Sequence, residues 1–239
     1  MKLTIIIPAY NEEKKIEKDI LLADEFLAAN NIQGEIIVVD DGSSDATYSK
    51  AELLKEKISS RILVLRNEIN LGKGSAVKKG MIEASGEFRA YCDAGATVPY
   101  NNLLTGMKLL EDNICDIAHG SRMLPDSVIK ISQAKDRKFS SAVIRFLVVK
   151  LLGVPNLLTD TQCGFKIYKT EAAEKIFPML NTNGFMFEVE NILRAIKNNL
   201  RITEFPIEWR CDRDSRITLL KTPWKVLLEI VKIKMMRID

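Results

Sequence analysis

Apolar and polar positions along the first half of the chain follow two alternating patterns. Short apolar runs cover residues 3–7, 35–39, 61–65 and 88–92. Between and after them, apolar side chains recur at helical spacing in residues 11–29, 45–58, 73–84 and 101–110. Short apolar runs are typical of strands buried on both faces, and here each run is followed by a helical segment. The pattern predicts an α/β fold with a mostly parallel central sheet and helices on both faces.

The second half of the chain is less regular. Residues 171–180 and 187–199 have helical spacing, and residues 201–209 are typical of a strand. Two further apolar segments, 139–154 and 223–237, carry interspersed Lys and Arg and are too short to span a membrane. Such segments either lie in a membrane interface or pack on the sheet. We find no repeat or linker, and expect one catalytic domain at 1–217 followed by a basic amphipathic helix at 218–239.

Polar clusters follow three of the predicted strands. They occupy residues 8–13, 40–45 and 93–97, and Pro8 is expected to end the first strand. In parallel sheets, ligands bind beyond the carboxyl ends of the strands. The three clusters are therefore expected to surround one crevice.

Three features in and near these clusters could carry chemistry. Asp40 and Asp41 form either a solvated turn or a ligand-binding pair, because Asp and Gly are common in turns. Asp93 follows a buried strand, and a carboxylate there can hold a hard divalent cation such as Mg²⁺ or Mn²⁺. Lys73 lies between two glycines just before a helix, where backbone N–H groups can receive a phosphate.

Charge and composition exclude several functions. The net charge of +3 gives no argument for nucleic-acid binding. The charge is unevenly distributed, with −5 on residues 1–120 and +8 on residues 121–239, and the positive second half favours an anionic partner. His119 is the single histidine, so a His-rich zinc site is excluded, and we expect it to pack in the core rather than act as a base. The four scattered cysteines predict reduced thiols in a cytosolic protein.

Several motifs together resemble glycosyltransferase family 2. They are TIIIPAYNEE at 4–13, VVDDGSSD at 38–45, NLGKGSAVKKG at 70–80 and HGSR at 119–122. DTQCGFKIY at 160–168, GFMFEVE at 184–190 and EW at 208–209 are similar to one branch, the dolichyl-phosphate glucosyltransferases and polyprenyl-phosphate mannose synthases. The motifs occur in the family's order over residues 3–217. The resemblance implies a GT-A-type nucleotide-sugar-binding fold.

The resemblance also implies roles for residues on the donor side. The residues expected to bind the nucleotide sugar are Pro8, Ala9, Tyr10, Glu12, Asp40, Asp41, Lys73, Asp93 and Ala94. One carboxylate of Asp40 and Asp41 would contact the base, and Lys73 would lie near the diphosphate. Asp93 matches the first acid of the family's Asp-Ala-Asp metal motif, but Gly95 stands where the second acid is usual. A cation would then rely on Asp93, the diphosphate and water.

On the acceptor side, the resemblance implies that Arg122, Lys166 and Arg216 bind phosphate. Asp160 and Gln162 either orient sugar hydroxyls or cap a loop, and Lys166 has a surface cation as its alternative. Of Glu188 and Glu190, one is expected to reach the site while the other faces solvent or a helix end. The expected catalytic residues are Asp93, Arg122 and Glu188.

The implied reaction moves a hexose, with glucose from UDP-glucose preferred, to a polyprenyl or dolichyl phosphate with inversion at the anomeric carbon. We expect peripheral contact with the cytoplasmic face of a membrane, either directly or through a membrane partner protein. Two alternatives stay open. One is a family 2 enzyme that acts on a cell-surface glycan, and the other is a nucleotide-sugar-binding protein whose catalysis is weakened by Gly95.

Overall fold

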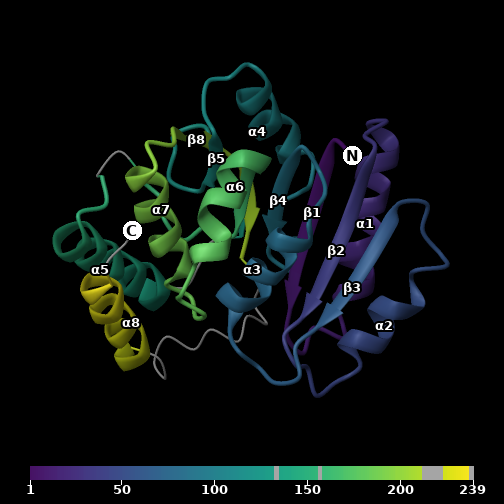
Figure 1. Ribbon diagram of the computed structural model, residues 1–239, viewed down its shortest axis with the longest axis horizontal. Coiled ribbons are helices and arrows are strands. Elements are labelled where there is room, and N and C mark those ends of the chain that lie inside the picture. Colours follow the sequence, from purple (N-terminus) through teal and green to yellow (C-terminus); the bar gives the residue numbers. More distant parts are fainter. Residues whose placement is uncertain (132–134, 156–157, 212–222, 237–239) are drawn as a thin grey trace.

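A central sheet of seven strands runs through the protein (Figure 1). The computed structural model describes the chain except residues 132–134, 156–157, 212–222 and 237–239. The strands lie in the order β3-β2-β1-β4-β7-β5-β8. Their bounds are β1 Leu3–Ala9, β2 Gly34–Asp40, β3 Arg61–Arg66, β4 Phe88–Cys92, β5 Ile117–Ser121, β7 Phe165–Lys169 and β8 Ile202–Pro206.

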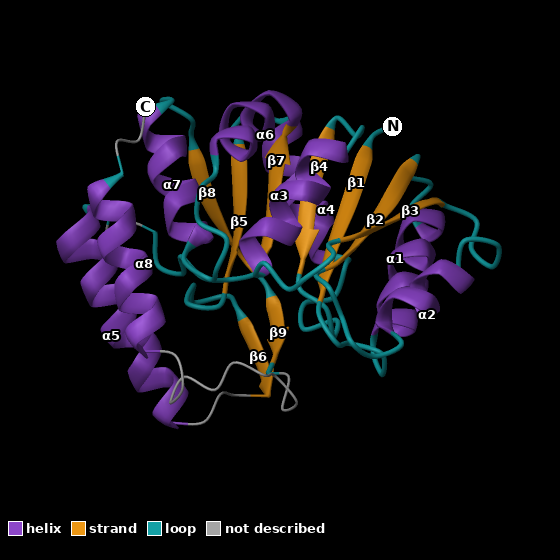
Figure 2. Cartoon of the chain, turned by 60° about the horizontal axis from the view of Figure 1, so that its bottom comes forward, coloured by secondary structure: helices purple, strands orange, loops and turns teal. Residues whose placement is uncertain are grey.

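All neighbouring strands of this sheet are parallel except those that pair with β7. This strand runs antiparallel to β4 on one side and to β5 on the other. A second, two-stranded parallel sheet of β6 Val128–Ile131 and β9 Glu208–Arg210 projects from one edge of the main sheet (Figure 2). The predicted α/β fold with a mostly parallel sheet is confirmed.

Helices cover both faces of the sheet, as the apolar runs predicted. The helices are α1 Ile16–Ala29, α2 Thr47–Leu53, α3 Lys73–Glu83, α4 Asn102–Glu111, α5 Lys135–Leu152, α6 Thr170–Ile176, α7 Phe187–Lys197 and α8 Pro223–Met235, with a 3-10 turn η1 at Phe177–Met179. Successive strand side chains point to opposite faces. Ile5 and Ile7 therefore join a core with α1, α2 and α4, whereas Ile6 joins a second core with α3, α6 and α7.

Helices α5 and α8 lie side by side at one end of the molecule (Figures 1 and 2). Val148 of α5 and Ile230 and Ile233 of α8 are buried in a third apolar cluster, which also includes residues of α7. The inner faces of both helices are therefore packed against protein. None of the helices in the described ranges combines the length and the apolar character needed to cross a bilayer.

Several helices are shorter than expected, such as α2, and two strand boundaries also differ from expectation. Pro8 does not end the first strand but lies within it, opposite Val39 of β2. The pairing of β1 with β4 extends only to Ile6. Pro8, which has no N–H to donate, is therefore tolerated because it lies beyond the part of β1 that pairs on both sides. Residues 201–209, expected as one strand, divide between β8 in the main sheet and β9 in the small sheet.

Three strands were not anticipated from the sequence. They are β5, β6 and β7. Fully buried Lys166 interrupts the apolar pattern of β7, and His119 and Ser121 do the same in β5. β6 has the sequence VIKI, an apolar run of only four residues broken by Lys130, and all four side chains are exposed rather than buried in a core.

Candidate active site

A pocket of about 410 Å³ opens at the carboxyl ends of β1, β2 and β4. Its lining includes the three polar clusters that the sequence placed at this edge, together with the start of α3 and part of the loop before α7. The predicted donor residues that line it are Pro8, Ala9, Tyr10, Glu12, Asp41, Lys73, Asp93 and Ala94. The crevice expected from the strand pattern is therefore present.

The two neighbouring aspartates at the end of β2 have different environments. Asp40 does not line the pocket, because its fully buried carboxylate pairs with Arg66 at 3.1 Å and accepts the N–H of Ser43. The Asp41 carboxylate lies at the pocket, where it accepts N–H groups of Leu71 at 3.1 Å and Gly72 at 2.7 Å. Only Asp41 of this pair is in a position to contact a ligand.

The start of α3 is closed by a neighbouring loop. Gly72 has a φ of +110°, and a β-carbon there would overlap the carbonyl oxygen of Asn183. That oxygen accepts the N–H of Gly74 at 2.7 Å and the N–H of Ser75 at 3.3 Å. These two amides are therefore engaged by protein, and the expectation that this helix start receives a phosphate is not supported for them.

Four alternating charges run from the pocket wall into the interior. Lys73 Nζ lies 2.7 Å from Asp93 Oδ1 and 3.0 Å from Glu188 Oε1, and Lys166 Nζ lies 3.0 Å from Glu188 Oε2. Side-chain exposure falls along this series, from 36% for Asp93 through 16% for Lys73 to 2% for Glu188 and 0% for Lys166. The four residues link the donor pocket to the middle of the sheet.

Ion pairing outweighs burial in setting the charges of this series. Burial alone would lower the pKa of Lys73, but Asp93 and Glu188 raise it above its usual value. Burial alone would raise the pKa of Glu188, but Lys166 and Lys73 hold it below its usual value. Both groups are therefore charged at neutral pH.

The loop that carries Asp93 is held by groups on both sides. A β-carbon at Gly164 would overlap the Asp93 carboxylate, so only glycine allows this approach. Gly95, at the position of the missing second acid, has a φ of +93° and donates its N–H to Asp19 Oδ2 at 2.7 Å. Burial raises the pKa of Asp19 to about 6. Asp19 was not anticipated, since it lies on α1 outside the recognised motifs, where an acidic residue in the first turn of a helix is common.

The residues present fit a divalent cation only in part. No group of three or more His, Cys, Asp or Glu side chains that could hold a metal occurs in the described ranges. Asp93 is partly exposed at the pocket, and Gly95 adds no side-chain oxygen. The arrangement therefore fits a cation that takes one protein carboxylate and draws its other oxygen ligands from substrate and water.

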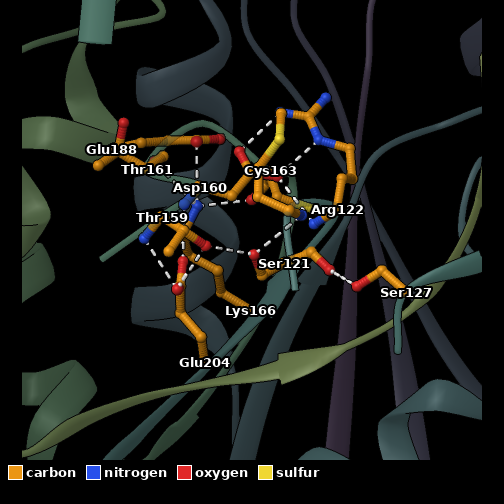
Figure 3. A network of polar contacts seen from close by, with 11 residues as sticks. Ser121, Arg122, Ser127, Thr159, Asp160, Thr161, Cys163, Lys166, Glu188 and Glu204 are labelled. Atoms are coloured by element: carbon orange, nitrogen blue, oxygen red, sulfur yellow. Dashed lines mark hydrogen bonds and ion pairs between the residues drawn. The ribbon is translucent and has the colours of Figure 1, made fainter. Parts of the chain in front are cut away.

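A second polar network lies beside the end of β5 (Figure 3). Arg122 donates from Nε and Nη2 to the two oxygens of Asp160, at 2.6 and 2.7 Å. Its guanidinium carbon lies 5.3 Å from the ring centre of Trp209. The Arg122 pairing holds the pKa of Asp160 below its usual value although burial opposes this. The pair uses two of the five N–H donors that a guanidinium carries.

Glu204 fixes the loop that bears Asp160. Its carboxylate accepts the N–H groups of Thr159 at 2.8 Å and Asp160 at 2.7 Å, and also the Thr159 hydroxyl at 2.8 Å (Figure 3). Ser121 contacts the same Thr159 hydroxyl at 2.9 Å. No sequence pattern points to Glu204, because it lies 44 residues from Asp160 and outside the motifs.

Lys166 lies behind the site rather than on the protein surface. Its ammonium group donates to the carbonyl oxygens of Cys163 at 2.5 Å and Thr161 at 3.4 Å, in addition to Glu188 (Figure 3). An ammonium group has three donors, and all three are directed at protein. The surface-cation interpretation is wrong, and direct phosphate contact by Lys166 is not favoured.

The other predicted residues have different outcomes. Glu190 does not face solvent but is fully buried, and it pairs with Arg194 at 2.8 Å and accepts the N–H of Thr182 at 2.7 Å. His119 is buried in the core as expected, and burial and then Lys166 hold its pKa well below the usual value. Gln162 is half-buried.

Two more outcomes concern Arg216 and the cysteines. Arg216 lies outside the described residues. The four cysteines are free, and three of them are buried.

The chain matches known proteins over most of its length. The family model of glycosyl transferase family 2 matches residues 4–177. A dolichyl-phosphate beta-glucosyltransferase of Saccharomyces cerevisiae is 30% identical over 98% of this chain and 74% of its own length. One of Drosophila melanogaster is 34% identical over 91% of this chain and 70% of its own length.

Solved glycosyltransferase structures share this architecture. Glucosyl-3-phosphoglycerate synthase from Mycobacterium tuberculosis, solved with Mn²⁺, uridine diphosphate and phosphoglyceric acid, superimposes with a TM-score of 0.72 at 17% identity. The similarity covers 98% of this chain and 79% of that one. It establishes the GT-A fold. The family match over residues 4–177 and the sequence relatives show that the chain belongs to glycosyltransferase family 2.

Proposed function

We propose that this protein transfers glucose from UDP-glucose to a polyprenyl phosphate of the dolichyl type, with inversion at the anomeric carbon. One observation carries the proposal: the donor pocket and the buried series Asp93–Lys73–Glu188–Lys166 share one crevice. The chain is also about 30% identical, over nearly its whole length, to dolichyl-phosphate beta-glucosyltransferases.

On the donor side, the proposal assigns nucleotide binding to the residues around Asp41 and diphosphate binding to Lys73. Lys73 and Asp93 both line the pocket. The Lys73 ammonium can therefore turn from Asp93 toward a diphosphate bound there. Asp93 would hold a divalent cation, Mg²⁺ or Mn²⁺, which when bound supplies positive charge to the leaving diphosphate.

On the acceptor side, the nucleophile needs little help from a base. A phosphate monoester has a second pKa near 6, so its oxygen is already charged at pH 7. That oxygen forms a bond to the anomeric carbon while the bond to the diphosphate breaks, and UDP leaves with the electron pair. His119 is buried with a lowered pKa, which agrees with a reaction that uses no histidine base. Arg122, held in orientation by Asp160, offers its remaining N–H donors to the acceptor phosphate.

Because the proposed acceptor is a lipid, the proposal includes contact of the protein with a membrane surface. Phe146 on α5 and Leu228 and Met235 on α8 are 61%, 60% and 75% exposed, and exposed lysines lie on both helices. Apolar side chains mixed with lysines are typical of helices that lie on a membrane interface. We therefore assign residues 1–217 to catalysis and 218–239 to docking at the cytoplasmic face, directly or with a membrane partner protein.

A transfer assay with radiolabelled UDP-glucose tests this function. A polyprenyl phosphate and a polysaccharide acceptor are offered separately, with Mg²⁺ or Mn²⁺, to the wild type and to Asp93→Asn. We expect label in the lipid fraction only, and a decrease of about 10²–10³ in turnover for the variant, as for loss of one group that stabilises a leaving charge. Label in the polysaccharide would favour the glycan acceptor instead.

Donor binding without transfer would favour a binding protein. This alternative is motivated by Gly95, which leaves the metal site with one carboxylate. Calorimetry with UDP-glucose on the same protein distinguishes the two cases. A wild type that binds UDP-glucose but transfers nothing to either acceptor would contradict the proposed enzyme.

A further inference from the structure

Glu229 is the one acidic residue in the sequence of α8, which otherwise carries Lys225, Lys232 and Lys234 among apolar side chains. Its carboxylate points inward, where Oε2 accepts the N–H of Met186 at 3.0 Å. A β-carbon placed on Gly184 would overlap the same carboxylate. Glu229 therefore contacts the loop before α7 at two points.

This loop, residues 181–186, forms part of the donor pocket. Gly184 and Phe185 line the pocket directly. The carbonyl oxygen of Asn183 accepts N–H groups from the start of α3, the helix that begins with Lys73. Met186 immediately precedes α7, whose second residue is Glu188. A shift of the loop would thus move both partners of the Lys73–Glu188 pair.

Three elements hold the loop from different sides. Glu190 of α7 accepts the N–H groups of Asn181 and Thr182, and α3 donates to Asn183. Glu229 is the contribution from α8. A carboxylate that accepts a backbone N–H at the start of a helix makes a charge-assisted hydrogen bond and also interacts favourably with the helix dipole. The part of the loop nearest α7 depends on this contact with α8.

We propose that Glu229 is a positioning residue for the donor site, through which the C-terminal helix completes the nucleotide-sugar pocket. The inference rests on the proposed function of that pocket. Glu229 touches no reacting group; it fixes the backbone at Met186, and that backbone fixes Phe185 on the pocket wall and Glu188 beside Lys73. Any partner or surface that displaces α8 would then weaken donor binding.

The test measures UDP-glucose affinity by calorimetry and Met186 amide hydrogen exchange in three variants of the full chain. We expect Glu229→Ala to weaken UDP-glucose binding about tenfold and to accelerate exchange at Met186, as loss of a charge-assisted hydrogen bond implies. Glu229→Gln keeps an oxygen that can accept the N–H, so it should recover most of the affinity. Glu171→Ala removes an exposed carboxylate from α6 and serves as the matched control with wild-type affinity.

The readouts separate positioning from a general structural role. Faster exchange at Met186 in Glu229→Ala, with UDP-glucose affinity within twofold of the wild type, would overturn this inference and leave the proposed function standing. Equal loss of affinity in Glu229→Ala and Glu171→Ala would overturn it too. Should Glu229→Ala fail to fold, Glu229→Gln decides: a decrease in affinity that accompanies faster Met186 exchange supports the inference, and a decrease in affinity with unchanged exchange overturns it. A wild type that binds no UDP-glucose overturns the proposed function and this inference with it.

Discussion

The two halves of the central sheet hold their polar residues in different ways. At the ends of β1, β2 and β4, carboxylates are held largely by backbone amides: Asp41 by Leu71 and Gly72, and Asp19 by Gly95. Around β5 and β7, buried carboxylates are held by buried cations, as in Arg122–Asp160, Lys166–Glu188 and Arg194–Glu190. Asp41 and Asp19 therefore depend on loop geometry, whereas the three carboxylates of the second half depend on matched side-chain charges. The division is not complete, because Asp40 pairs with Arg66 and Glu204 accepts backbone N–H groups.

This difference predicts different tolerance to substitution. Removing one partner of a buried ion pair leaves the other charged and unsolvated, which costs about 3–5 kcal/mol. Removing a side chain that backbone amides hold leaves neutral N–H groups, which cost about 1–3 kcal/mol each when they stay unpaired. We call the half around β1, β2 and β4 the donor half and the half around β5 and β7 the acceptor half. Stability should therefore be more sensitive to substitution in the acceptor half than in the donor half.

The largest expected effect is that of Lys166→Ala. Glu188 would lose its fully buried partner and keep only Lys73, which is partly exposed and shared with Asp93, so the free energy of unfolding should decrease by about 3 kcal/mol in urea denaturation. The double variant Lys166→Met/Glu188→Gln removes both charges and should recover much of that loss without recovering transfer activity. If the double variant is no more stable than Lys166→Ala, an uncompensated charge is not the cause.

The pH dependence of stability gives a second contrast, because the pKa of Asp19 in the first half is raised whereas those of Asp160 and Glu188 in the second half are lowered. The pKa of Asp19 is raised from 3.8 to about 6, so the folded state binds its proton more tightly than the unfolded state does. Its contribution therefore makes the free energy of unfolding fall as the pH rises from about 4 to 6, by about 3 kcal/mol. The pKa values of Asp160 and Glu188 are lowered instead. The stability that these two carboxylates contribute is therefore lost when the pH falls below those values and they become protonated.

Asp19→Asn isolates the first of these effects. Urea denaturation of the variant and the wild type at several values between pH 4 and 7 should show the difference between them changing by about 3 kcal/mol in favour of the variant. A constant difference across that range would mean that Asp19 titrates normally.

Arg122→Lys should have a smaller effect. Lysine keeps the charge but cannot make the two parallel hydrogen bonds to Asp160, so we expect a loss of about 1–2 kcal/mol in the free energy of unfolding. The Michaelis constant for the acceptor should rise more than that for UDP-glucose in a transfer assay. Equal changes in both constants would argue against an acceptor role for Arg122.

The smallest expected effect is that of Asp41→Asn in the donor half. The amide oxygen can still accept one N–H from the 71–72 loop, so the stability loss should be about 1 kcal/mol or less. Affinity for UDP-glucose, measured by calorimetry, should decrease several-fold. A destabilisation as large as that of Lys166→Ala would contradict the distinction between the two halves.

The same distinction explains what the sequence could predict. The donor pocket is built from the ends of apolar strands and the loops that follow them, so Pro8, Asp41 and Asp93 are recognisable from local pattern. Asp40, one residue away, could not be distinguished from Asp41, because which carboxylate faces the pocket depends on Arg66 and Asn67.

The acceptor half gave weaker signals. Arg122 and Asp160 lie 38 residues apart, and Lys166 and Glu188 lie 22 apart, so only the fold brings them together. A buried lysine in β7 also breaks the apolar pattern on which strand prediction depends. The sequence predicts solvent or a helix end for Glu190; it lies in the first turn of α7, where Arg194 one turn further along makes its burial tolerable.

The reversed strand β7 limits how the enzyme can move. Because β7 is hydrogen-bonded to β4 on one side and to β5 on the other, the two halves are parts of one uninterrupted sheet. Hinge-bending between two lobes would have to break strand ladders in the core, whereas rim loops can rearrange at much lower cost. We therefore expect substrate capture to proceed by local loop ordering over a rigid floor, with little rotation of one half against the other.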